Sequence, residues 1–172
     1  MSFTRKFNSL AAASGADLAT TSDIVTDAMT AFGMAADGTS KVIKDGLEVE
    51  VSNTARFADV LAAASNNANT NVEMMGESFK YVAPAAGALG YSVEDVATAL
   101  GLMANSGIKA SNAGTALRTL FTNMANPSDT MANAMENLGV SLEDDEGNMK
   151  SLAQVMQDLR DGFGSLKIPQ EE

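Results

Sequence analysis

Residues 71–124 read NVEMMGESFKYVAPAAGALGYSVEDVATALGLMANSGIKASNAGTALRTLFTNM, and this stretch decides the fold. Its apolar residues recur at the three- and four-residue spacing of amphipathic helices, which predicts three helices separated by turns. The middle helix is predicted to begin at Val93, because the Ser92 hydroxyl and the Asp95 carboxylate can bind the free amides of a helix start. Residues 105–107, Asn-Ser-Gly, are expected to end it. The stretch contains almost no groups capable of catalysis, so we interpret it as a packing unit.

The helix after this turn is expected to be capped by Ser111 or Asn112. With the middle helix it would form a helical hairpin, in which Leu100 and Leu117 sit in the middle of facing apolar stripes. These two leucines are therefore predicted to anchor the hairpin.

The helix before the middle one is expected to be capped by Thr70 together with Glu73. Pro84 is expected to kink this helix or to split it in two, because proline removes a helical hydrogen bond and clashes with the carbonyl four residues back. Small residues follow at Ala85, Ala86 and Gly87. They favour tight helix-on-helix contact over a deep aromatic core.

The chain as a whole is predicted to be all-α, with short helices packed as helical hairpins. We divide it into an N-terminal helical pair at 1–36, a linker or insertion at 37–52, a central helical core at 53–139, and an acidic link with a C-terminal helix at 140–172. The segment 37–51 mixes glycines with charged and β-branched residues, so an irregular or short-strand insertion at the surface is expected there.

Turn and cap signals place the helices outside the central stretch. In the N-terminal pair, Gly15 is expected to end the first helix, Thr20 with Asp23 to cap the second and Gly33 to end it. After Pro127, Ser128 is expected to begin a helix that Gly139 ends. The apolar residues expected to face inward are, on this helix, Met131, Met135 and Leu138, and, on the C-terminal helix, Leu152, Val155, Met156, Leu159 and Phe163.

Residues 57–140 read FADVLAAASNNANTNVEMMGESFKYVAPAAGALGYSVEDVATALGLMANSGIKASNAGTALRTLFTNMANPSDTMANAMENLGV, and this string resembles the core region of phage tail tape measure proteins. The resemblance rests on the order and spacing of NANTNVEMMGES, YVAPAAGALG, ALGLMANSGIKAS and GTALRTL. It extends from about Leu10 to Val140, and more loosely to Phe163.

The resemblance implies a structural virion protein that occupies the tail lumen and sets tail length by templating polymerisation of the tail-tube protein. It implies the tail-tube protein, the tail assembly chaperone and distal-tail or tail-tip proteins as partners. The expected location is the virion tail, after synthesis in the bacterial cytoplasm. Because such proteins are much longer, this chain is expected to be an excised segment or the product of a truncated prophage gene. The alternative is a free-standing, non-catalytic helical adaptor or regulatory domain derived from a prophage, and the flanking genes would separate the two.

The composition restricts the chemistry. The chain has no cysteine and no histidine, which excludes disulfides, thiolate zinc sites and Ser-His triads. The acidic run Glu143–Glu146 lacks the alternation of an EF-hand loop and is expected to be a solvated turn. We therefore predict no enzyme activity and no catalytic, cofactor-binding or metal site.

Charge and hydrophobicity restrict the partners. The net charge is −11, and Lys109 and Arg118 do not make a basic face, so no sequence-specific nucleic-acid binding is expected. The longest apolar run, near residues 97–104, is far too short to span a bilayer, and residues 1–10 lack the apolar core of a signal peptide. Hydrophobic residues make up 45% of the chain but aromatics only 5%, with eleven methionines. Such a soft core favours modest stability or dependence on self-association.

Overall fold

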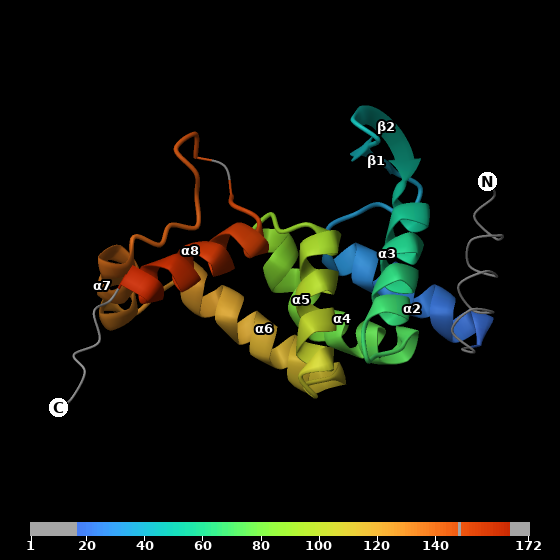
Figure 1. The fold of residues 1–172 in the computed structure, drawn as a ribbon. Helices are drawn as coiled ribbons and strands as arrows, with labels where there is room; N and C mark the ends of the chain where they lie inside the picture. Colours follow the sequence, from blue (N-terminus) through green and yellow to red (C-terminus); the bar gives the residue numbers. More distant parts are fainter. Residues whose placement is uncertain (1–16, 148, 166–172) are drawn as a thin grey trace.

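The computed structural model describes residues 17–147 and 149–165, which form seven helices and one two-stranded antiparallel sheet (Figure 1). The elements are α2 (Leu18–Ala31), β1 (Thr39–Lys44), β2 (Leu47–Ser52), α3 (Asn53–Asn67), α4 (Val72–Ala88), α5 (Val93–Asn105), α6 (Ala110–Ala125), α7 (Asp129–Leu138) and α8 (Leu152–Ser165). This confirms the predicted helical class with a short-strand insertion. The helix predicted to end at Gly15 lies outside the described residues.

Several predicted helix ends are confirmed. Helix α5 begins at Val93, and the Ser92 hydroxyl accepts a hydrogen bond from the Asp95 amide at 3.0 Å. Helix α7 is capped by Ser128 and ends at Gly139, whose φ of 67° is left-handed. Such a conformation suits glycine because it has no Cβ.

Three predicted helix starts are wrong by one or more residues. Helix α2 begins before Thr20, at Leu18, because the Asp17 carboxylate accepts from the amides of residues 19 and 20. Helix α4 is capped by Asn71 and not by Thr70, because the Asn71 side chain accepts from the amide of residue 74 at 2.8 Å. Helix α6 begins at Ala110 with no side-chain cap, ahead of both predicted capping residues.

A kink or a split was expected at Pro84, and the split does not occur, because α4 is continuous from Val72 to Ala88 with the proline inside it. Pro84 is exposed, whereas Val82, Ala83 and Ala86 around it are fully buried. We infer that tertiary packing on these buried side chains holds the backbone helical across the missing hydrogen bond.

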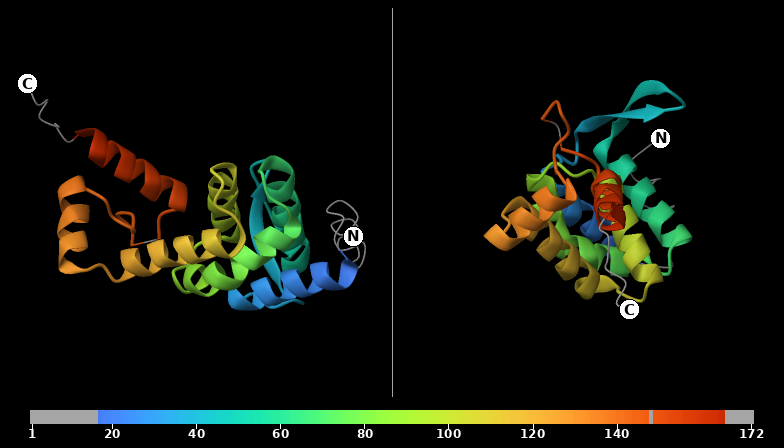
Figure 2. Two further views of the ribbon diagram at one scale, coloured as in Figure 1. Left: turned by 90° about the horizontal axis from the view of Figure 1, so that it is seen from below. Right: turned by 60° about the vertical axis from the view of Figure 1, so that its left-hand side comes forward.

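Helices α2, α4 and α6 form one layer, and α3 and α5 stand on it (Figure 2). Helix α6 packs most extensively against α4, so the predicted α5–α6 hairpin is the lesser contact of α6. Leu100 and Leu117 are 1% and 3% exposed, which confirms that both belong to the core. Phe32 packs edge-on against Phe57 and Phe79, which are tilted against each other, at the junction of α2, α3 and α4.

The α4–α6 contact brings two backbones together at Gly114. A Cβ atom on Gly114 would lie 2.2 Å from the carbonyl oxygen of Ser78, which is closer than real Cβ atoms approach. Ser78 is 2% exposed, and its hydroxyl donates a hydrogen bond to the carbonyl oxygen of Ala110 at 2.8 Å. The crossing therefore depends on the absence of a side chain at position 114.

A second, smaller core joins α7 and α8 beyond the end of α6, where it contains Met124, Val140 and Val155. Gly162 approaches the backbone of Leu138 in the same way, with a Cβ position 2.5 Å from the carbonyl oxygen. The described residues cover α8 on one side only, and Met156 and Phe163 are 50% and 60% exposed. The prediction that these two side chains face inward is wrong.

Substitution of Gly114 by alanine tests the crossing. We expect Gly114→Ala to lower the free energy of unfolding by about 1–3 kcal/mol, the usual cost of overpacking, despite the better helix propensity of alanine. Gly164→Ala on α8 is the matched control, since a Cβ there meets nothing within 4 Å. Urea denaturation followed by circular dichroism compares the two, and a Gly114→Ala variant as stable as the wild type would refute the backbone contact.

Candidate interaction surface

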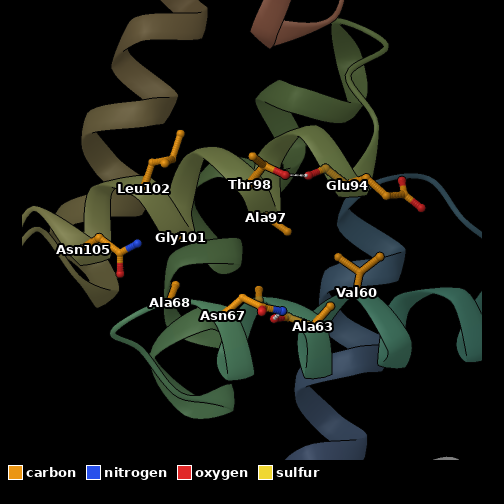
Figure 3. A pocket seen from close by; sticks show the side chains of 11 residues that line it. Val60, Ala63, Asn67, Ala68, Glu94, Ala97, Thr98, Gly101, Leu102 and Asn105 are labelled. Atoms are coloured by element: carbon orange, nitrogen blue, oxygen red, sulfur yellow. Dashed lines mark hydrogen bonds between the residues drawn. The ribbon is translucent and has the colours of Figure 1, made fainter.

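The first hollow on the surface lies between α3 and α5 and has a volume of about 320 Å³ (Figure 3). Its floor is made of small side chains on the facing sides of the two helices. Gly101 contributes to the close approach, because a Cβ there would lie 3.3 Å from Ala68. The residues that line it are Val60, Ala63, Ala64, Asn67, Ala68, Glu94, Ala97, Thr98, Gly101, Leu102 and Asn105.

The second hollow, which we call the α8 groove, lies between α5, α6 and α8 and has a volume of about 270 Å³. Asp95 is its single charged residue. Leucine, methionine and alanine side chains make up most of the wall. The full lining is Asp95, Thr98, Ala99, Leu102, Met103, Leu117, Leu120, Leu152, Ala153 and Met156.

Thr98 and Leu102 line both hollows, so the outer side of α5 forms a narrow wall between them. Leu102 is 65% exposed, and Met156 is on the α8 side of the groove. Exposed large apolar side chains beside an apolar hollow are typical of surfaces that bind other proteins. We therefore take Leu102, Met156 and the α8 groove as the candidate interaction surface.

The sequence analysis missed this surface because it looked for buried stripes. Leu102 lies outside the apolar stripe that α5 buries. A large apolar residue on the otherwise polar side of an amphipathic helix is the sequence feature that could have indicated this surface. Helical spacing predicts that Met156 faces inward, but spacing alone does not reveal that none of the described elements covers that side of α8.

An ion pair joins α3 to α5 at the edge of the first hollow. The Arg56 guanidinium donates from Nε to Glu94 Oε1 at 2.7 Å and from Nη2 to Oε2 at 2.6 Å. This bidentate geometry is the strong form of a carboxylate contact. Hydrogen bonding to Glu94 raises the pKa of Arg56. Burial acts to raise the pKa of Glu94, but hydrogen bonds from Arg56 and from its own backbone amide, with the charge of Arg56, lower that pKa below its usual value.

The acidic turn predicted at Glu143–Glu146 is present. The Gly147 amide donates to the Asp144 carbonyl at 3.0 Å, and Glu143 and Met149 form a β-bridge below the turn. Within residues 17–147 and 149–165, no group of three or more carboxylates is arranged to hold a metal ion. Over the same residues, no helix has the length and apolar character to cross a membrane.

Comparison with known proteins gives the class of this molecule. The family model described as phage-related minor tail protein matches residues 1–172, and the chain belongs to this family. Among curated relatives, the chain is similar to the tape measure protein of Pneumococcus phage Dp-1, with 37% identity over 157 residues. It is also similar to the probable tape measure protein of Escherichia phage P2, with 26% identity over 121 residues. The chain is thus a tape measure-like phage tail protein, as the sequence resemblance predicted.

The matches cover most of this chain but little of the relatives. They include 91% and 70% of this chain, but only 12% of the Dp-1 protein and 15% of the P2 protein. No solved structure matches the chain.

The lowered pKa of Glu94 predicts how stability depends on pH. The folded protein holds this carboxylate ionised to lower pH than the unfolded chain does, so the stabilisation is present above the ordinary pKa and is lost as the pH falls through the folded value. Glu94→Gln should be less stable than the wild type near neutral pH, and the gap should close in strong acid. Urea denaturation near neutral pH and in strong acid measures the difference in the free energy of unfolding between Glu94→Gln and the wild type.

Glu136→Gln, at an exposed position of α7, is the control and should change stability little at either pH. A stability gap for Glu94→Gln that stays constant from neutral to strongly acidic pH would show that the ion pair with Arg56 does not cause it.

Proposed function

We propose that this chain is a folded, non-catalytic section of a tape measure protein, which occupies the tail lumen and sets tail length by templating polymerisation of the tail-tube protein. The names of the relatives support the role, since one is a tape measure protein and the other a probable tape measure protein. The absence of cysteine and histidine from the sequence supports a structural task over catalysis.

The structural observation that supports this proposal is the α8 groove, which is exposed on the surface and can bind another protein. We propose that this section docks on other tail components, namely the tail-tube protein, the tail assembly chaperone or the distal-tail and tail-tip proteins. Leu102 and Met156 provide large apolar contacts, and the groove between α5, α6 and α8 can accept a side chain of the partner. A rim of charged and polar residues around such a centre is usual at protein interfaces.

The fold also bears on how the section contributes to length. Helix α4, with 17 residues, is the longest of the described helices, and the helices fold back on one another. An unbroken helix of 172 residues would extend roughly 260 Å at about 1.5 Å per residue. A folded section therefore adds much less to an axial ruler than its residue count implies.

An in-frame deletion of this section in the parent phage tests the role. We expect tails shortened by well under the roughly 260 Å of a continuous rod, or tails that fail to initiate if the section docks the tip or tube proteins. Electron microscopy of the virions measures tail length directly. If tails form in normal number but are shortened by the full length of a continuous rod, the section is not folded back on itself and the proposal is wrong.

Charged substitutions in the groove test the docking surface separately. Leu102→Glu combined with Met156→Glu should leave the chain folded, because both side chains are at least half exposed, yet reduce the yield of complete tails about tenfold or more. Ile108→Glu, at an exposed turn position outside the groove, is the matched control. If the groove variant gives normal tails in normal number, the groove is not the docking surface.

A further inference from the structure

The β-hairpin projects from the helical body (Figure 1). Strands β1 and β2 pair in an antiparallel register from Thr39 opposite Ser52 to Lys44 opposite Leu47. The two-residue turn has Asp45 at φ 52° and Gly46 at φ 78°, the left-handed pair that favours tight hairpins. Among residues 17–147 and 149–165 the sheet has these two strands alone, so each strand has one open edge.

The two strands carry opposite charge. Strand β1, TSKVIK, holds Lys41 and Lys44 and no acidic residue, whereas β2, LEVEVS, holds Glu48 and Glu50 and no basic residue. Within the hairpin the Lys41 ammonium lies 2.7 Å from Glu48 Oε1. The Lys41 and Glu48 side chains remain 72% and 56% exposed, so both are accessible to a further strand.

The hairpin also exposes two large apolar side chains next to its turn. Ile43 is 73% exposed and Leu47 is 68% exposed. Open edges with unpaired backbone groups and exposed apolar side chains are templates for the addition of another strand, and soluble proteins usually cover or block them.

We propose that a second copy of this chain covers the hairpin, by adding the open edge of its β2 to the open edge of β1. Side chains alternate between the two faces of a strand, so Lys41 shares a face with Glu48 and Glu50, whereas Lys44 lies on the opposite face. Cross-strand neighbours on one face of a sheet lie about 5 Å apart, so Lys41 of one copy would face the acidic side chains of the added β2. The same contact repeats on the remaining open edges, because each copy offers one basic and one acidic strand.

The charge pattern selects this pairing over the two symmetric ones. Two β1 strands side by side would oppose lysines, and two β2 strands would oppose glutamates, both of which are destabilising. A β1–β2 contact between copies joins unlike surfaces, so it closes into a ring or continues as a filament. This inference concerns contact between copies of the chain and does not depend on the tail role proposed above.

A charge-swapped chain, Lys41→Glu, Lys44→Glu, Glu48→Lys and Glu50→Lys, gives the decisive experiment. It preserves opposite charges within the hairpin and between like copies, so it should self-associate as the wild type does in analytical ultracentrifugation. Mixed with wild type, it should fail to co-assemble, because each mixed contact then opposes like charges. We expect mixed species, counted by native mass spectrometry of isotope-labelled chains, to fall about tenfold or more below random mixing.

The half-swapped chain, Lys41→Glu with Lys44→Glu, should lose self-association. Its matched control is Lys80→Glu with Arg118→Glu, which alters the net charge by the same amount at exposed positions away from the hairpin. A wild-type chain that stays monomeric, free co-assembly of wild-type and swapped chains, or equal loss in the control pair would each overturn the proposal. Circular dichroism confirms that every variant is folded.

Discussion

The close approach of α4 and α6 at Ser78 and Gly114 is the contact on which the rest of the arrangement depends. It sets α6 in the layer formed with α2 and α4, so that Leu117 and Phe121 enter the main core. The same helix then runs past the edge of that core to α7 at its far end, and α8 extends from beside α5 to α7 (Figures 1 and 2). A shift at this crossing would therefore move both the core residues of α6 and the wall of the α8 groove.

Small residues make the other contacts of α4 possible as well. Gly76 faces Ile24 of α2, and Gly87 faces the backbone of Phe32, with Cβ positions 2.6 and 3.1 Å from the nearest atoms. The interior therefore combines close approaches at glycines with a few large buried side chains, of which Phe57, Phe79 and Phe121 are the largest. Dispersion contacts between closely packed backbones replace part of the area that aromatic rings would bury.

Local features were the part of the fold that the sequence could predict. The capping of α5 and α7, the stripes of α5 and α6, and the strand character of residues 47–51 are set by neighbours a few positions away, and the structure confirms them. The partner of α6 could not be predicted, because a short turn from α5 suggested a hairpin while the closest fit is to α4. The start of α2 was misplaced because several polar residues competed for the cap. The exposure of Leu102 and Met156 could not be predicted either. It depends on which sides of α5 and α8 the other described helices leave uncovered, and this is set by the tertiary structure.

Leu120 of α6 packs against both hydrophobic cores, and α8 contributes Leu152 to the main core and Val155 to the smaller one. Tension applied at the C-terminal side of the fold would thus reach the main core through α6 and through the start of α8. The small core around Val140 and Val155 has fewer buried side chains to resist it. Under a pulling force, α7 and α8 would therefore detach and extend first, and the aromatic junction of α2, α3 and α4 would yield last.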